Sequence, residues 1–138
     1  MKRFTSALCL TLAMAPAVAE DGMSPIMRWY DALEIADVPS LSALIHTDEK
    51  QPFRYEVADL GITQNRDEFI ASMAEWVGAI SGGRIDHKVT DTTDGGVTAM
   101  VCYRFTDSEL LAEEKIVLKD DKITAVTQTA KGDSCSEF

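Results

Sequence analysis

Three ionisable side chains, Asp59, His87 and Glu114, stand among apolar neighbours in a way that suits acid–base chemistry. Asp59 closes a strand-like run shortly before Gly61, and the other two lie in segments where apolar residues alternate. Burial beside apolar groups raises the pKa of a carboxyl and prepares it for proton transfer. These three residues are therefore the candidate catalytic residues, with Asp59 moving the proton and His87 or Glu114 as the partner acid.

Each candidate also has a simpler structural interpretation. Asp59 is of a residue type that closes turns through its own side-chain oxygen. His87 has no second ligand in the sequence, which favours a packed histidine bonded to the backbone or to a tyrosine. Glu114 at the rim of a sheet would reach water or a lysine. No phosphate loop, nucleophile elbow or metal-ligand spacing occurs, so neither a cofactor nor a metal is expected.

The periodicity of the chain predicts the elements that position these residues. Apolar residues recur at helical spacing in residues 26–33, and a second, short helix follows. Residues 65–80 predict the strongest helix, which begins with a capping box of Asn65 and Glu68. A short strand, FRYEVAD, precedes that helix. From Arg84 onward the period is two, which predicts four strands connected by hairpins. Helices followed by an antiparallel meander indicate an α+β domain with helices on one face of the sheet.

Strand alternation selects the side chains that face those helices. His87, Tyr103 and Glu114 fall on the inner, mostly apolar face of their strands, whereas Cys102 falls on the opposite face. Aromatic residues gather on the same inner side. The candidate ligand-binding residues are therefore Trp29, Tyr30, Phe69, Trp76, Tyr103 and Phe105. The alternative for these aromatic side chains is a role in the hydrophobic core.

The order helix, short helix, strand, helix and four-stranded meander resembles the nuclear transport factor 2-like superfamily, which includes ketosteroid isomerase and the SnoaL-like proteins. Three stretches carry the resemblance: ADVPSLSAL after an aromatic first helix, VADLG before a loop, and NRDEFIASM at the start of the third helix. It covers nearly the whole of residues 20–138. The fold it implies is a curved antiparallel sheet, with N-terminal helices on the concave face and a cone-shaped pocket between them.

The comparison with ketosteroid isomerase implies roles for individual residues. Asp59 matches the position of the family's aspartate base, and Glu114 falls near its oxyanion-hole aspartate on a long strand. Trp29 falls at the place of the oxyanion-hole tyrosine, with Tyr30 adjacent. An indole cannot replace a phenol as an acid, which argues against a steroid-type isomerisation.

Residues 1–19 have the features of a secretory signal. Lys2 and Arg3 precede a short apolar run, and Ala17-Val18-Ala19 forms a small-residue cleavage site. Cleavage there would leave a single domain of 119 residues, with a net charge of −12 rather than −10, because the leader holds two basic residues and no acidic one. Such an acidic chain is unsuited to nucleic acid or to anionic membranes. The expected location is the periplasm or the exterior.

Cys102 and Cys135 are the two cysteines that remain after this cleavage. An even pair in an exported protein predicts a disulfide, and the alternative is two free thiols.

The sequence favours a pocket that binds a small organic ligand. The second possibility is a cofactor-independent acid–base enzyme, namely an isomerase, dehydratase or hydrolase, and the third is a scaffold without activity. The superfamily that this sequence resembles includes proteins of all three classes, so the fold alone does not determine the function. The family resemblance also implies a dimer through the outer face of the sheet. That face carries mixed charges here, so only a weak homodimer is expected.

Overall fold

The computed structural model describes residues 23–138, so the predicted leader and its cleavage site lie outside the described part. Its helices are α1 (Met23–Glu34), α2 (Val38–Leu44) and α3 (Arg66–Ile80), with a 3₁₀ turn, η1 (Ala58–Leu60). Its strands are β1 (Arg54–Val57), β2 (Ile62–Gln64), β3 (Arg84–Thr93), β4 (Gly96–Arg104), β5 (Glu109–Lys119) and β6 (Lys122–Gly132). No helix within residues 23–138 has the length and apolarity needed to span a bilayer.

The starts of α2 and α3 are fixed by side chains that replace missing backbone acceptors. Asp37 accepts a hydrogen bond from the Ser40 amide at 3.3 Å at the start of α2. At α3, Asn65 accepts from the Glu68 amide at 2.9 Å, and Glu68 accepts from the Asn65 amide at 3.0 Å. This reciprocal pair is the capping box that the sequence predicts.

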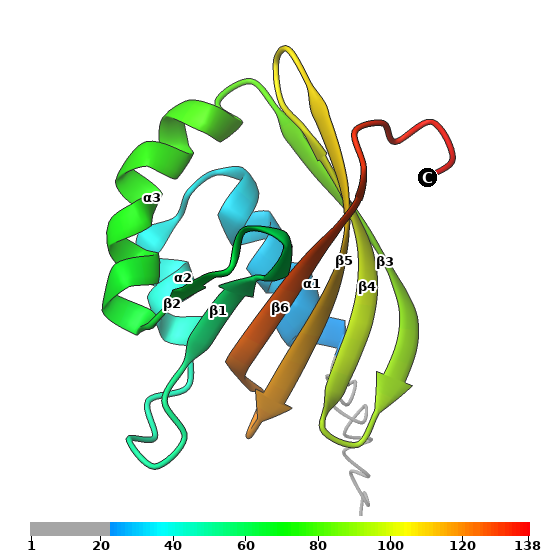
Figure 1. Ribbon diagram of the computed structural model, residues 1–138. Helices are drawn as coiled ribbons and strands as arrows, with labels where there is room; N and C mark the ends of the chain where they lie inside the picture. The colour runs from blue at the N-terminus through cyan, green and yellow to red at the C-terminus, as the bar shows by residue number, and fades with distance from the viewer. Residues whose placement is uncertain (1–22) are drawn as a thin grey trace, which may run out of the picture.

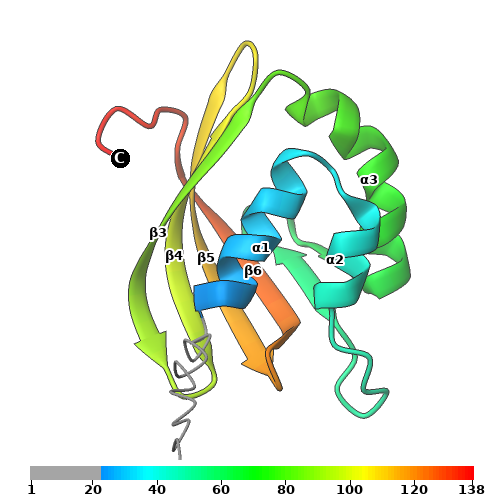
Figure 2. The same ribbon diagram turned by 180° about the vertical axis from the view of Figure 1, so that it is seen from behind.

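The six strands form one curved sheet in the order β2-β1-β6-β5-β4-β3. The predicted meander of β3 to β6 is antiparallel, as expected. The sheet as a whole is mixed, because β1 pairs with β6 in parallel, with Tyr55 opposite Val126. Figures 1 and 2 show all three helices on the concave side of this sheet. The predicted α+β architecture with helices on the concave face is thus confirmed.

Bulges in the ladders of β3/β4 and β5/β6 help the long strands to bend. In the β3/β4 ladder the register shifts between Val89 and Asp91 of β3. In the β5/β6 ladder it shifts twice, and the extra residue lies on β6 each time, at Lys131 and at Thr124. Each bulge increases the local twist, so the meander wraps around the helices instead of lying flat beneath them. The core fills the space between the helices and the concave face, and Trp29 lies at its centre, stacked on Phe69.

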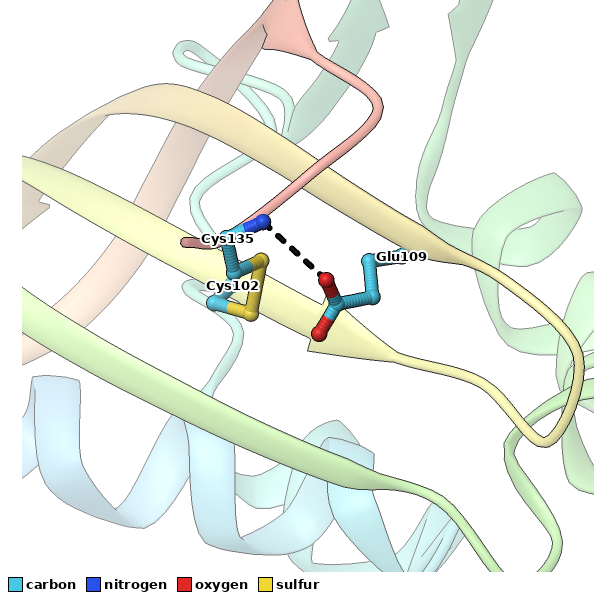
Figure 3. A group of neighbouring side chains, drawn as sticks. All are labelled: Cys102, Glu109 and Cys135. Atoms are coloured by element: carbon cyan, nitrogen blue, oxygen red, sulfur yellow. Dashed lines mark hydrogen bonds between the residues drawn. A yellow bond between two sulfur atoms is a disulfide. The ribbon is translucent and has the colours of Figure 1, made fainter. Parts of the chain in front are cut away.

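The predicted disulfide joins Cys102 of β4 to Cys135 of the C-terminal tail. The tail leaves β6 on the side of the sheet away from α3 (Figure 1). Glu109 also holds the tail, because one of its carboxylate oxygens accepts a hydrogen bond from the Cys135 amide at 3.2 Å (Figure 3). The other oxygen accepts one from Arg104 Nη1 at 2.6 Å. The two sulfurs and this carboxylate lie close enough for a metal site. The sulfurs are bonded to each other and the carboxylate is already paired with Arg104 and the Cys135 amide. The cluster therefore attaches the C-terminal tail to the sheet.

The hairpin between β5 and β6 turns through Asp120 and Asp121. Both residues have positive φ, at 52° and 60°. A two-residue hairpin loop with positive φ at both positions is the type I′ turn, in which Asn-Gly and Asp-Gly are the favoured pairs. A side chain with Cβ is strained in this conformation, so the second aspartate places avoidable strain in the turn.

We expect loss of the disulfide to lower stability by about 3 to 4 kcal/mol, since the bond closes a loop with a sequence separation of 33 residues. The double variant Cys102→Ser/Cys135→Ser should melt on the order of 10 °C below wild type without reductant. Wild type melted with reductant should fall to the level of the variant. An unchanged wild-type melting temperature under reducing conditions would contradict the bond.

Asp121→Gly should raise the free energy of unfolding by roughly 0.5 to 1 kcal/mol, because glycine adopts the left-handed conformation without strain. The matched control is Asp94→Gly in the β3/β4 hairpin, where the aspartate does not have positive φ. This control should be neutral or slightly destabilising. Urea denaturation of the two variants measures the difference, and a gain at Asp94 equal to that at Asp121 would refute the explanation.

Candidate functional site

A cavity of about 350 Å³ lies between α3 and the concave face of the sheet. Helix α3 supplies one wall and strands β1, β4 and β6 supply others. The lining residues are Leu33, Tyr55, Val57, Gln64, Phe69, Ser72, Met73, Glu75, Trp76, Ala79, Tyr103, Phe105, Leu110 and Gln128. They are predominantly apolar and aromatic, as in most small-molecule sites.

Aromatic rings hold one another in fixed orientations around this cavity. Trp76 meets Tyr103 and Phe105 edge-on, with ring centroids 5.9 and 5.8 Å apart. Tyr55 stacks on Phe69 at 4.9 Å. The indole Nε1 of Trp76 donates to the Leu33 carbonyl at 2.7 Å, which locks the ring between α3 and α1. The walls are therefore preformed instead of being assembled by a ligand.

The predicted ligand-binding residues divide into two groups. Phe69, Trp76, Tyr103 and Phe105 line the cavity, as proposed from the sequence. Trp29 and Tyr30 do not line it; both are buried in the core, with Tyr30 only 1% exposed. Their rings support the wall from behind, Trp29 through Phe69 and Tyr30 through its hydrogen bond to Glu114.

Glu114 is fully buried and accepts three hydrogen bonds from three different elements. Tyr30 of α1 donates to Oε1 at 2.8 Å. Tyr103 of β4 and Gln128 of β6 donate to Oε2 at 2.5 and 2.7 Å. Gln128 Nε2 also lies 3.4 Å from the hydroxyl of Tyr55. We call these five residues (Tyr30, Tyr55, Tyr103, Glu114 and Gln128) the polar cluster.

Burial governs the ionisation of the polar cluster. It raises the pKa of Glu114 above its ordinary value, against the opposing effect of the three donated hydrogen bonds. The pKa values of Tyr30, Tyr55 and Tyr103 are raised well above 10.0, first by burial and then by the charge of Glu114. The three phenols therefore keep their protons at neutral pH. None of them is a ready proton donor for catalysis.

Three members of the polar cluster, Tyr55, Tyr103 and Gln128, also line the cavity and form its polar wall. The hydroxyl hydrogen of Tyr103 and one amide hydrogen of Gln128 are directed at Glu114, and Gln128 Nε2 also donates to Tyr55 Oη. The groups that remain for a ligand are the lone pairs of Tyr103 Oη, the amide oxygen of Gln128 and the hydroxyl of Tyr55. Glu114 thus orients Tyr103 and Gln128 so that these two residues offer hydrogen-bond acceptors.

His87 lies on the inner face of β3, as strand alternation predicts, but outside the cavity lining. Its ring stacks on Tyr30 with centroids 4.6 Å apart. Burial lowers its pKa, while the nearby Asp31 and Asp86 oppose that change. The stacking matches the packed-histidine interpretation, and Tyr30 stands between His87 and Glu114 in the chain of contacts.

Asp59 lies on the exposed surface of η1, and it does not line the cavity. Its carboxylate accepts the backbone amide of Ala130 at 2.5 Å. Strand β1 ends at Val57, so its parallel ladder with β6 stops opposite Gln128. The Asp59 side chain continues that ladder by pairing a β6 amide that the β1 backbone no longer reaches. The structure therefore does not bring the three candidate catalytic residues together in one cavity.

Sequence reasoning missed Tyr55 and Gln128. Gln128 lies directly opposite Glu114 in the β5/β6 register. Bulges at Thr124 and Lys131 of β6 shift this register, so simple alternation along β6 does not assign its inner face. Tyr55 sits on a four-residue strand whose partner, β6, is about 70 residues away in the sequence. The available signal is the pairing of strands: an amide side chain placed opposite the inward-facing Glu114 would have identified Gln128.

No protein-family profile and no curated protein sequence matches this chain. Solved structures do match it in fold. A nuclear transport factor 2-like protein of unknown function from Mesorhizobium loti aligns with a TM-score of 0.62 and 19% identity, over 80% of this chain and 91% of that one. An epoxide hydrolase of LEH-like type from M. tuberculosis aligns with a TM-score of 0.60 and 9% identity, over 80% and 82%.

A third structure is a hypothetical protein with a ketosteroid isomerase-like fold from Catenulispora acidiphila, in complex with trimethylamine. It aligns with a TM-score of 0.57 and 14% identity, over 75% of this chain and 82% of that one. At sequence identities this low, the structural matches establish the arrangement of helices and strands but not the activity. The curved sheet, the helices on its concave face and these matches together show that the chain has the nuclear transport factor 2-like fold.

Proposed function

We propose that this protein binds a small organic molecule in the cavity between α3 and the sheet. The observation that carries the proposal is the preformed aromatic cavity with a polar wall held in one hydrogen-bonded orientation. Few convergent polar groups in an otherwise apolar cavity are typical of sites that orient one small ligand. The trimethylamine bound to the Catenulispora acidiphila structure supports a small ligand for this fold.

The geometry favours binding over acid–base catalysis. The predicted base, Asp59, is committed to the Ala130 amide outside the cavity, and His87 packs on Tyr30. Glu114 does not line the cavity, whereas its hydrogen-bond donors Tyr103 and Gln128 do. A general base needs to approach the proton it removes to hydrogen-bond distance. The cofactor-independent enzyme is therefore the second candidate, supported by the epoxide hydrolase among the matching folds.

The proposed location is the periplasm or the exterior, on the basis of the leader-like residues 1–19 and the Cys102–Cys135 disulfide. We further propose that any homodimer through the convex face is weak. The disulfide-bound tail occupies part of that face, and Asp86 accepts from Arg84 and Arg104 beside it. An interface of this kind would have to desolvate several charges.

A ligand that fills the cavity should be excluded by a large side chain on its wall. Ala79 lines the cavity from α3, whereas Ala74 on the same helix does not. We expect the neutral fluorophore N-phenyl-1-naphthylamine to bind wild type saturably, and Ala79→Trp to weaken this binding about tenfold or more by occupying its volume. Fluorescence titration measures both.

The matched control Ala74→Trp should bind the fluorophore as wild type does, because residue 74 does not line the cavity. Equal binding by wild type and Ala79→Trp would count against the cavity as the binding site.

The burial of Glu114 also predicts how stability depends on pH. The folded protein holds the proton of this carboxyl more tightly than the unfolded chain, whose pKa is near 4.5. The stabilising contribution is therefore full below that pKa and is lost as the pH rises through the higher folded pKa. Glutamine does not titrate, so Glu114→Gln should gain stability relative to wild type as the pH rises from 4 to 8. The gain is about 1.4 kcal/mol for each tenfold increase in proton affinity on folding.

Urea denaturation at several pH values measures this difference. Glu113→Gln, on the neighbouring position and opposite face of β5, serves as the control and should show no such trend. A difference between wild type and Glu114→Gln that stays constant across the range would show that folding leaves the proton affinity of this carboxyl unchanged.

A further inference from the structure

The charged residues that line the cavity are acidic only. Its lining contains Glu75 but no lysine, arginine or histidine. Within residues 23–138, the basic side chains that form ion pairs do so with acids outside the cavity lining, namely Glu56, Asp86, Glu109 and Asp48. An anionic ligand would therefore find no counter-ion in this cavity, and a cationic one would find acidic groups.

Glu114 increases this asymmetry, because within the described chain its carboxylate is held by neutral donors only. Two phenols and one amide contact it, and no basic side chain among residues 23–138 does. Keeping a buried carboxylate ionised without a cation nearby costs desolvation free energy. A positive charge in the adjacent cavity would offset this cost, and the low polarity of the surroundings would strengthen the attraction.

The aromatic walls suit the same kind of ligand. Rings of Tyr55, Phe69, Trp76, Tyr103 and Phe105 line the cavity. The faces of such rings attract cations, and the attraction grows when water is excluded. The acceptors that Tyr103 Oη and the Gln128 amide oxygen present to the cavity suit a hydrogen-bond donor on the ligand. A cation, an apolar body and an N–H group together match these features.

We propose that the cavity binds a small organic ammonium ion that carries at least one N–H group. This inference rests on the proposed binding function and assigns its ligand class. The ammonium group would donate to Tyr103 or Gln128 and lie close to the charge of Glu114, and the apolar body would pack against Phe69, Trp76 and Phe105.

A matched series of ligands tests the proposal directly. Cyclohexylammonium, cyclohexanol and cyclohexanecarboxylate share one apolar ring and differ in the charge and hydrogen-bonding of the head group. Displacement of N-phenyl-1-naphthylamine at pH 8 gives the affinity of each. We expect the ammonium ion to bind at least tenfold more tightly than the alcohol, and the carboxylate to bind more weakly than the alcohol.

Glu114→Gln should remove this preference. The affinity for cyclohexylammonium should fall about tenfold or more, while that for cyclohexanol should change less than threefold, because glutamine keeps the volume and loses the charge. Glu113→Gln is the matched control and should behave as wild type. Circular dichroism and melting curves check that both variants are folded.

A measurement on wild type alone covers the case in which Glu114→Gln does not fold. Cyclohexylammonium stays charged between pH 4 and 8, so its affinity should fall as protonation of Glu114 removes the negative charge, by up to tenfold per pH unit below the folded pKa. The affinity for cyclohexanol should stay flat.

Other groups that face Glu114 or the cavity need controls in this pH series. The hydroxyls of Tyr30, Tyr55 and Tyr103 stay protonated throughout, since burial raises their pKa values. Glu75 on the α3 wall and His87, stacked on Tyr30, are the remaining titratable groups. His87→Gln should retain the pH dependence of wild type. Glu75→Gln removes an acid of the lining, and the fall in affinity that protonation of Glu114 causes should still be seen in it.

The outcomes separate this inference from the binding function on which it rests. If the fluorophore binds and is excluded by Ala79→Trp, the binding function holds. The ammonium assignment is then overturned if the carboxylate binds as tightly as the ammonium ion. It is likewise overturned if the preference survives in Glu114→Gln or persists unchanged at low pH, or if no member of the series displaces the fluorophore. If the fluorophore itself does not bind, the proposed function fails first.

Discussion

The carboxylate of Glu114 can be buried in the centre of this protein only because α1, β4 and β6 each deliver a donor to it. An unsatisfied carboxylate at that position would cost several kcal/mol. The donors come from positions 84, 11 and 14 residues away in the sequence, so they meet only when the first helix, the meander and the last strand are all in place. The placement of α1 against the sheet, and with it the shape of the cavity, depends on this convergence.

The same convergence sets the chemical character of the cavity. Tyr103 and Gln128 each donate a hydrogen bond to Glu114, which leaves Tyr103 Oη and the Gln128 amide oxygen as acceptors for the remaining space. An oxyanion hole needs the reverse arrangement, in which donors face the ligand and stabilise developing negative charge. Comparison with the family by sequence position places Glu114 near an oxyanion-hole acid. Its hydrogen-bond partners indicate a different role, because Glu114 accepts hydrogen bonds from the residues that line the cavity. In this chain the acid acts on the orientation of its neighbours.

Much of the fold could be predicted because its signals are local. The capping box at Asn65, the period-two meander and the placement of Tyr103 and Glu114 on the inner face all follow from short stretches of sequence. The errors concern long-range contacts. Nothing near Asp59 indicates that its carboxylate pairs with Ala130, and the parallel pairing of β1 with β6 leaves no local mark. Gln128 was overlooked because bulges on its own strand, β6, break the simple alternation.

The disulfide that attaches the C-terminal tail to β4 also affects how the protein unfolds locally. Strand β6 is the last strand of the chain, yet it lies between β1 and β5 inside the sheet. Chain ends are where structures ordinarily fray, and peeling of this strand would carry Gln128 away from Glu114. The bond between Cys102 and Cys135 ties the end of the chain back to β4, so β6 cannot separate progressively from its terminus. Its amide hydrogens can then exchange with solvent only through a larger, cooperative opening that also breaks the walls of the cavity.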